Sequence, residues 1–465
     1  MPASEQPSPD QPWPSIIALA DAVRSGRSTA RAETERAIER IVRLNPGLNA
    51  IISFDPADAL ARADAVDRRV QAGEELPLAG VPVTIKDNIW VKGRRITQGS
   101  RLFKDFVAPQ DAVAVERLEA AGAVILGISN TPEFAAKGQT TNLLYGATRH
   151  PMNSGLTPGG SSGGAVASVA GGLVPLALGT DAGGSSRRPP AHTGLVGFKP
   201  SFGAIPYGPG FEEPFFGVSC HCPITRTVAE AALAFEVMAG PDPRDPHSAF
   251  VEPGEPVDIT ALTIAYTPKW GLDVPVEPEV ADVVARVADM LRGAGLNVVA
   301  QDPVWPAGLA EAGLNPIQHA GLAALHGAAW RQAPDLIDPD LGAQIAAGFD
   351  LSGPDVGRAM LLSEQVALSA ARFFSDHRFD AAIGPTTPCT AWPIDQLGPD
   401  TIAGVKVGPR GHAVFTPLFN HARQPAISVP CGTDASGLPI GLQIIAPRLK
   451  DRTLLAIAAA VEALL

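Results

Sequence analysis

Cysteine is scarce in this 465-residue sequence, which contains four cysteines and no cysteine-rich segment. Cys220, Cys222, Cys389 and Cys431 are too few for a disulfide framework in so long a chain, which indicates a reducing compartment. Cys220 and Cys222 flank His221, but one residue between the thiols, with no second cysteine pair, does not fit the spacing of zinc ligands. We therefore predict no metal site.

Charged residues are also scarce. They make up 18% of the chain, below the ~25% of ordinary soluble proteins, so much of the chain must be buried. The formal net charge of −12 repels nucleic acid and anionic membrane surfaces. The longest near-apolar stretch, 165–179, is interrupted by Ser168 and Pro175 and is shorter than the ~18 residues of a membrane span. We predict a cytoplasmic protein with neither nucleic acid nor a membrane as a partner.

The amino terminus lacks the basic start and apolar run of a secretory signal. Residues 1–14, MPASEQPSPDQPWP, predict a disordered leader before a folded region at 15–465. Within that region helical and strand patterns alternate, which is typical of an α/β sandwich. Between about 303 and 375 the periodicity is helical without a convincing strand, and no linker interrupts the chain, which predicts an inserted helical region.

Hydrophobic periodicity and capping residues predict the individual elements. The expected helices are 16–23, 29–44, 112–121, 163–170, 225–238, 278–293 and a last helix through Leu464. The expected strands are 123–128, 173–178, 195–198, 262–265, 296–299, 426–429 and 440–445.

Three short segments carry residues suited to catalysis. The run 81–88, VPVTIKDN, presents Lys86 at the end of an apolar, strand-like stretch. The loop 157–164, TPGGSSGG, leads directly into a small-residue helix. The segment 179–187, GTDAGGSSR, also follows an apolar strand, and two glycines precede Ser185, which lets backbone N–H groups approach a substrate as an oxyanion hole requires. Together these segments offer a nucleophile, a relay hydroxyl, a lysine base and an oxyanion cradle.

The run 159–200, GGSSGGAVASVAGGLVPLALGTDAGGSSRRPPAHTGLVGFKP, resembles the defining signature of the amidase signature family. The resemblance extends through KDN at Lys86, SNTPEF at 129–134, CPITRTV at 222–228 and QPAISVPCGTDASGLPIGLQII at 424–445. It implies one large α/β/α sandwich with a mixed central sheet surrounded by helices. The core motifs then lie in 81–230 and 380–465, and the insertion at 303–375 is the variable, substrate-side part.

The resemblance also implies the roles of the site residues. Ser185 is the nucleophile, Ser161 relays protons through an unusual cis peptide, and Lys86 is the final base, a triad that needs no metal or cofactor. The implied oxyanion donors are the backbone N–H groups of Ala182, Gly183, Gly184 and Ser185. A lysine accepts a proton only when it is neutral, so burial must lower the pKa of Lys86.

Other positions near the signature carry weaker implications. Asp181 and Arg187 are expected to brace the loop, because buried charges are usually paired. Arg188, His192 and Arg423 depart from the common pattern of the family. The loop 203–216 is rich in aromatics and turn formers, and it predicts either a pocket wall or lid or ordinary surface packing. Its candidate pocket residues are Tyr207, Phe211, Phe215 and Phe216.

By this resemblance the chain is a hydrolase of linear amide C–N bonds that forms an acyl-enzyme. Its expected partner is a small-molecule amide or carbamate, in the manner of an aliphatic amidase, an aryl acylamidase or a urethanase, and the sequence is compatible with a homodimer. The main alternative is the glutaminase subunit of a tRNA-dependent amidotransferase complex, which shares the motif.

Three further alternatives fit less well. Residues 160–164 match the G-x-S-x-G elbow of an α/β-hydrolase with Ser162 as nucleophile, but the approach 154–158 is turn-like rather than a strand. A non-catalytic binding protein would not need Lys86, Ser161 and Ser185 together. Neither glycine-rich loop completes a P-loop pattern, which disfavours nucleotide binding.

Overall fold

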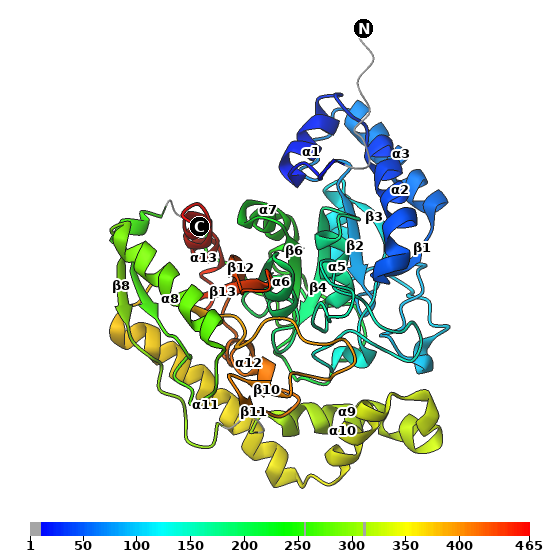
Figure 1. The fold of residues 1–465 in the computed structure, drawn as a ribbon. Helices are drawn as coiled ribbons and strands as arrows, with labels where there is room; N and C mark the ends of the chain where they lie inside the picture. The colour runs from blue at the N-terminus through cyan, green and yellow to red at the C-terminus, as the bar shows by residue number, and fades with distance from the viewer. Residues whose placement is uncertain (1–10, 255–256, 310–312) are drawn as a thin grey trace.

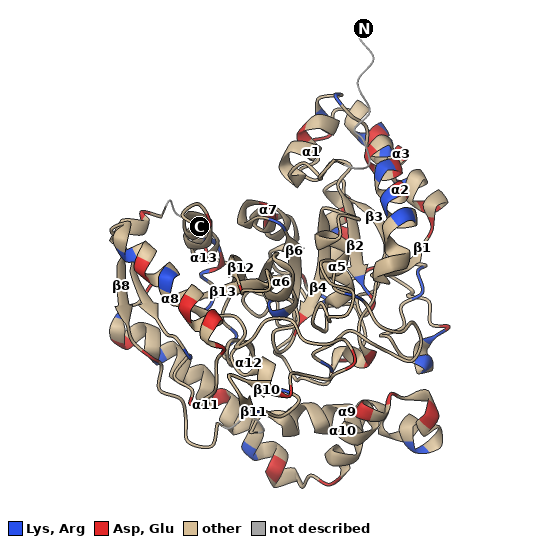
Figure 2. Cartoon of the chain, viewed as in Figure 1, with Lys and Arg blue, Asp and Glu red and all other residues tan. Residues whose placement is uncertain are grey.

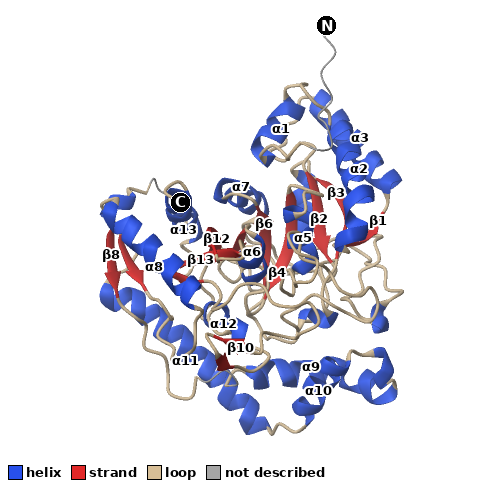
Figure 3. Cartoon of the chain, in the orientation of Figure 1, coloured by secondary structure: helices blue, strands red, loops and turns tan. Residues whose placement is uncertain are grey.

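The computed structural model describes residues 11–254, 257–309 and 313–465. A mixed sheet of eleven strands crosses the molecule in the order β1-β3-β2-β4-β6-β5-β12-β13-β9-β7-β8. Figure 3 shows these strands through the middle of the molecule with helices around them, which confirms the predicted α/β sandwich. The strands are β1 Ile51–Phe54, β2 Pro82–Lys86, β3 Val124–Ser129, β4 Leu176–Asp181, β5 Val196–Lys199, β6 Cys220–Thr225, β7 Thr263–Tyr266, β8 Asn297–Ala300, β9 Ala381–Pro385, β12 Ala426–Thr433 and β13 Pro439–Ile445.

The sheet is mixed because parallel groups near its two ends are joined by antiparallel strands. Strand β2 runs parallel to β3 and β4, and β7 runs parallel to β8 and β9. The strands β6, β5, β12 and β13 between them pair antiparallel. All residues of β2, β3 and β4 are buried, as expected for parallel strands covered on both faces.

The helices surround this sheet (Figure 1). They are α1 Ile16–Arg24, α2 Ala30–Leu48, α3 Pro56–Gln71, α4 Val113–Ala120, α5 Gly163–Ala170, α6 Arg188–Thr193, α7 Val228–Met238, α8 Pro278–Gly293, α9 Asn315–Gln332, α10 Pro339–Phe349, α11 Gly353–His377, α12 Thr416–His421 and α13 Asp451–Glu462. Their charged side chains are spread over outer helices such as α2, α3 and α8 (Figure 2). No helix within the described ranges is long and apolar enough to cross a membrane.

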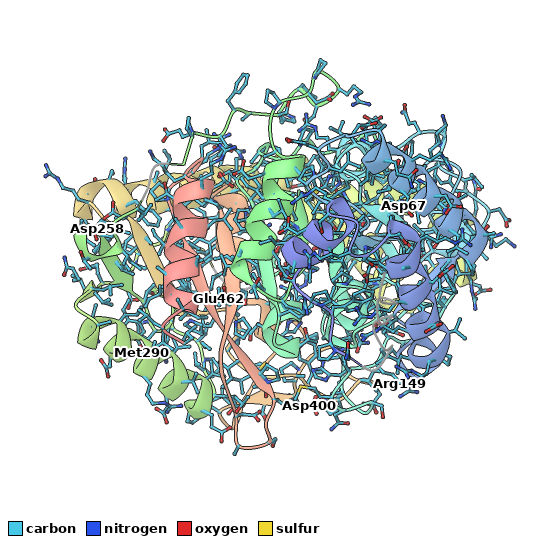
Figure 4. All side chains as sticks on the ribbon, turned by 90° about the horizontal axis from the view of Figure 1, so that it is seen from above. Asp67, Arg149, Asp258, Met290, Asp400 and Glu462 are labelled. Carbon is cyan, nitrogen blue, oxygen red and sulfur yellow. The ribbon has the colours of Figure 1, made fainter. Side chains whose placement is uncertain are left out.

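Carboxylates from neighbouring helices fix two helix starts. Asp67 of α3 accepts hydrogen bonds from Ala30 N at 2.7 Å and Arg31 N at 3.1 Å, at the start of α2. Glu462 of α13 accepts one from Val228 N at 3.0 Å, at the start of α7. Figure 4 labels both carboxylates and shows them far apart in the molecule. Each caps the positive end of a helix, so the helices are held to one another as well as to the sheet.

Most predicted elements lie within a few residues of the observed ones, and two boundaries differ for physical reasons. The helix expected to end at residue 44 continues as α2 through Pro46 to Leu48. Proline removes the donor to the carbonyl of Val42, but Val42 is 63% exposed, so water can satisfy that carbonyl. The helix expected from residue 225 begins at Val228, because Thr227 and Glu230 form a capping box there.

The expected leader 1–14 is described only in part, since residues 1–10 lie outside the described ranges. Trp13, which falls within the predicted leader, is 5% exposed. Its indole N–H donates to Gly172 O at 3.0 Å, and the guanidinium groups of Arg36 and Arg40 lie 4.4 and 5.0 Å from its ring centroid. The leader prediction is therefore wrong at Trp13, which packs against α2.

Three helices, α9, α10 and α11, occupy most of the predicted insertion from residue 315 onward, whereas 303–309 forms no helix. Helices α9 and α10 pack against one another, and α11 packs on α9. Figure 1 shows α9 and α10 together along one side of the molecule, beyond the small hairpin of β10 Thr401–Ile402 and β11 Val405–Lys406. No strand occurs in 303–309 or 313–375.

Candidate active site

The candidate site lies where two neighbouring parallel strands end. Lys86 is the last residue of β2, and Asp181 is the last residue of β4. The carboxyl ends of parallel strands meet at one edge of a sheet, so the segments after β2 and β4 are brought together. Ser161 and Ser162 come directly before α5, which packs against both strands (Figure 1). Three segments far apart in sequence therefore converge at this edge.

Lys86 is fully buried among hydroxyl groups. Its Nζ donates to Ser161 Oγ at 2.7 Å, to Ser162 Oγ at 3.0 Å and to Thr180 Oγ1 at 2.9 Å. None of these acceptors is charged, so no direct ion pair offsets the loss of water around the ammonium.

Burial lowers the pKa of Lys86 to about 7, although the charge of Asp181 opposes this shift. The nearby charge of Arg188 lowers the pKa of Lys86 further. Near neutral pH a large fraction of Lys86 is therefore neutral. This is the state in which a lysine can act as a base.

Ser161 sits at a cis peptide bond with Gly160, as the family resemblance implied. Its carbonyl oxygen accepts a hydrogen bond from Thr131 Oγ1 at 3.0 Å, which holds the loop before α5. Ser161 and Ser185 both line one small cavity of about 20 Å³. Ser161, the predicted relay, is therefore hydrogen-bonded to Lys86. It also lines the same small cavity as Ser185, the predicted nucleophile.

Asp181 and Arg187 form a fully buried ion pair beneath the Ser185 loop. Arg187 Nη2 and Nε donate to the two carboxylate oxygens of Asp181 at 3.0 Å each. Burial alone would raise the pKa of Asp181, but the charge and hydrogen bonds of Arg187 hold it well below its usual range. The pair braces the loop, as expected from the sequence.

One predicted oxyanion donor is already engaged. Gly184 N donates to Asp181 Oδ1 at 2.6 Å, so this N–H does not point freely into the cavity in this structure. The carboxylate of Asp181, at the end of β4, accepts this hydrogen bond and fixes the turn. The sequence alone does not show that this carboxylate competes with a substrate oxygen for the N–H. Ala182, Gly183 and Ser185 line the adjoining cavity, and their N–H groups stay candidates for the oxyanion hole.

A large cavity of about 980 Å³ opens beside Ser185. Its wall combines the Ser185 loop with residues of α9, α10 and the segment after the β10–β11 hairpin, including Gln318, Gln344 and Arg410. The sequence predicted a substrate-side helical insertion but did not identify these individual residues. Ser185 and Phe215 line both the large cavity and the small one.

Three of the four pocket residues predicted in the loop 203–216 line a cavity. Tyr207, Phe211 and Phe215 line the small cavity. Phe216 lies in neither cavity and is 52% exposed. Its φ of +51° turns the backbone at this point, so the side chain after Phe215 leaves the pocket. The prediction for Phe216 is not supported by its position.

Residues that departed from the family pattern have structural explanations in two cases. Arg423 has a φ of +57°, where glycine is the least strained residue, and it pairs with Glu364 at 2.7 Å. Burial lowers the pKa of His192 to about 3, and its ring meets Trp392 edge-on at 5.4 Å. His192 lines neither cavity.

Thr180 is a site residue that no sequence motif indicated. It accepts hydrogen bonds from Lys86 and, at 3.0 Å, from Asn88 Nδ2. Its position could have indicated a role, because Thr180 lies on β4 one residue before Asp181. The carboxyl ends of neighbouring parallel strands lie side by side, which brings Thr180 close to Lys86. Ser162 also reaches Lys86, but it lines neither cavity. Ser162 is not preceded by a strand, so the α/β-hydrolase elbow lacks its structural context.

Cys220 and Cys222 lie on β6 and are both buried, with free thiols. In the described part of the chain, no group of three or more His, Cys, Asp or Glu side chains is arranged to hold a metal ion.

Comparison with known proteins identifies the family. Residues 32–455 match the family model described as amidase. An acylamidase of Rhodococcus erythropolis is 37% identical over 460 residues, covering 97% of this chain and 95% of that protein. A glutamyl-tRNA(Gln) amidotransferase subunit of Synechococcus sp. (strain RCC307) is 35% identical over 482 residues, covering 95% and 96%.

A solved bacterial aryl acylamidase of the amidase signature enzymes superposes with a TM-score of 0.89 at 31% identity, covering 97% of this chain and 96% of that one. The chain belongs to the amidase signature family, whose enzymes hydrolyse C–N bonds.

Proposed function

We propose that this protein hydrolyses linear amides, anilides or carbamates through an acyl-enzyme formed on Ser185. The observation that carries the proposal is the buried hydrogen bond of 2.7 Å from Lys86 Nζ to Ser161 Oγ. It links a lysine of lowered pKa to a serine that shares a cavity with Ser185. A neutral amine in this position can draw a proton through Ser161 from the attacking hydroxyl.

In the first half-reaction, Ser185 Oγ attacks the carbonyl carbon of the substrate. Its proton passes to Ser161 Oγ as the Ser161 proton passes to the neutral Nζ of Lys86. The tetrahedral intermediate then collapses and the C–N bond breaks. The proton returns from Lys86 through Ser161 to the leaving nitrogen, which departs as the neutral amine or ammonia and leaves an ester on Ser185. Water repeats the sequence and releases the carboxylic acid, or a carbonic acid monoester when the substrate is a carbamate cleaved at its C–N bond.

Negative charge develops on the substrate oxygen in both steps. The N–H groups of Ala182, Gly183 and Ser185 are the candidates to stabilise it, since Gly184 N is bound to Asp181. Rigid bracing of this loop by the Asp181–Arg187 pair supports such a role, because an oxyanion hole works only when its donors are fixed in advance.

The size of the cavity supports a substrate larger than a simple aliphatic amide. A volume of about 980 Å³ lies at the upper end of the range for small-molecule sites. The similarity to an acylamidase and to an aryl acylamidase supports an anilide or a related aryl compound. We also propose a cytoplasmic location, which the four free cysteines support.

The test is hydrolysis by the purified chain alone. Matched amide, anilide, ester and carbamate substrates should be cleaved by the wild-type protein and by Ser436→Ala, which alters an exposed serine in the turn before β13. Ser185→Ala should reduce turnover at least ~1,000-fold while its circular dichroism spectrum stays unchanged. Equal turnover in Ser185→Ala would refute the proposal.

A second candidate function is the glutaminase subunit of a tRNA-dependent amidotransferase. It is favoured by one observation, the 35% identity to a glutamyl-tRNA(Gln) amidotransferase subunit across nearly the whole chain. This function predicts glutamine hydrolysis that depends on other subunits, and stable recovery of the chain in a heteromeric complex. Anilide or carbamate hydrolysis by the isolated chain, without glutaminase activity, would exclude it.

A further inference from the structure

Arg188 is a buried cation beside the proposed nucleophile. It is the first residue of α6, three positions after Ser185, and is 7% exposed. Its side chain lines the large cavity together with Gly183 and Ser185. The family signature does not account for it, because the signature arginine, Arg187, already pairs with Asp181.

The hydrogen bonds of Arg188 leave much of its guanidinium unused. Nη1 donates to Gly183 O at 2.7 Å, and Nη2 lies 3.5 Å from Gly160 O, while Nε is buried without a partner. An arginine carries five N–H donors. Within the described residues no carboxylate forms an ion pair with Arg188, and Asp181 is held by both Nε and Nη2 of Arg187.

Asp181 offsets part of the charge of Arg188 electrostatically, but its carboxylate is already paired with Arg187. Burial lowers the pKa of Arg188 to about 10, so the guanidinium stays protonated at neutral pH. The charge of Arg410, which lines the same cavity, lowers the pKa of Arg188 further. The acidic residues of the described wall are Asp273 and Asp340. Neither forms an ion pair with Arg188, and Asp340 is paired with Lys137 at 3.4 Å. A buried cation facing a cavity is costly unless an anion enters.

We propose that the substrate carries a carboxylate, and that Arg188 binds this carboxylate in the large cavity next to Ser185. The planar guanidinium suits a carboxylate because two N–H groups can bind its two oxygens together. The substrate is then an acidic amide, with the carboxylate either on the acyl part or on the amine part. This inference rests on the proposed amide hydrolysis and specifies its substrate class.

Two pairs of substrates separate the two positions of the carboxylate. For the acyl part, 4-nitroanilides of succinic, glutaric and adipic acid are compared with anilides in which isopropyl replaces the carboxylate. For the amine part, N-acyl-4-aminobenzoate is compared with the N-acyl-4-isopropylanilide. In at least one pair the acidic member should have a kcat/KM about tenfold or more above its neutral partner.

Arg188→Gln should abolish that preference, Arg188→Lys should keep part of it, and Arg358→Gln on the exposed face of α11 should leave it unchanged. Glutarate binding by calorimetry gives a readout that needs no turnover, and it should weaken about tenfold or more in Arg188→Gln. Each variant is first checked for a native circular dichroism spectrum.

Neutral substrates cleaved as well as acidic ones would overturn the carboxylate proposal while leaving amide hydrolysis intact. Glutarate binding that is absent, or unchanged in both Arg188 variants, would overturn it as well. Failure of every substrate would refute the proposed hydrolysis, and the glutarate measurement would then decide the role of Arg188 by itself.

Discussion

Lys86 Nζ lies 2.7 Å from Ser161 Oγ, and both residues are fully buried. The contact joins the end of β2 to the loop before α5, so the packing of that helix against the sheet sets its geometry. Because burial brings the pKa of Lys86 to about 7, the lysine changes its charge near neutral pH. Both the rate and the stability of the protein should depend on that charge.

Activity should rise with pH through the pKa of Lys86. Below about pH 7 the ammonium cannot accept a proton, and above it the neutral amine can. We expect kcat/KM to rise about tenfold per pH unit below pH 7 and then to level off. Lys86→Arg stays protonated and should lose nearly all amide turnover at every pH. An arginine variant with wild-type activity would remove Lys86 from the mechanism.

Stability should depend on pH through the same residue. The folded-state pKa of about 7 lies below the ordinary value of 10.5, so between these values the unfolded chain holds one proton more than the folded chain. The free energy of unfolding therefore gains up to about 1.4 kcal/mol per pH unit from Lys86 as pH rises through this window. In urea titrations at about pH 7 and about pH 9, the wild-type protein should gain stability relative to Lys86→Met. A constant difference would show that the pKa of Lys86 is not depressed.

Much of this site could be predicted from the sequence because its central residues lie in contiguous motifs at strand ends. Lys86, Ser161 and Ser185 each follow or precede a strongly patterned element, so local pattern singled out their segments. The resemblance to the amidase signature family then selected Ser161 and Ser185 from among neighbouring serines. The hydrogen bonds of Gly184 N and Thr180 could not be predicted from the sequence. Their partners depend on how β4 packs beside β2 and on which acceptor lies nearest.

The cavity wall was harder to predict for a related reason. Gln318 and Arg410 come from segments with ordinary helical or loop patterns, and they meet Ser185 only through long-range packing. The fold class followed from the alternation of helices and strands. Strands β1, β6 and β9 were missed. Proline and polar residues interrupt the apolar pattern of β6, and β1 and β9 are only four and five residues long.

Removing one partner of the Asp181–Arg187 pair should destabilise the fold strongly. Asp181→Asn leaves Arg187 as an uncompensated charge at 0% exposure, which typically costs about 3–5 kcal/mol. Glu364→Gln breaks the exposed pair with Arg423 and should cost less than about 1 kcal/mol. Urea unfolding of the two variants measures the difference, and similar losses would contradict the bracing role of Asp181.

Two adjacent glycines should respond differently to alanine. Gly184 has a φ of +112°, and a Cβ there would overlap the side chain of Thr416. Gly184→Ala should therefore lower the free energy of unfolding by more than about 1 kcal/mol. A Cβ at Gly183 has Pro417 at 3.9 Å as its nearest neighbour, so Gly183→Ala should change stability by less than about 0.5 kcal/mol. Equal unfolding midpoints for the two variants would contradict this conformation of the loop at Gly183 and Gly184.

The central claim is that Ser185, rather than a neighbouring serine, forms the covalent intermediate. Ser162 also contacts Lys86 and is the nucleophile of the competing α/β-hydrolase assignment, so the two sites must be separated directly. The decisive measurement is peptide mass spectrometry after treatment with a fluorophosphonate. We predict a single adduct on Ser185, which disappears in Ser185→Ala and persists in Ser162→Ala provided that variant keeps a native circular dichroism spectrum. An adduct on Ser162 in the wild-type protein would contradict the account.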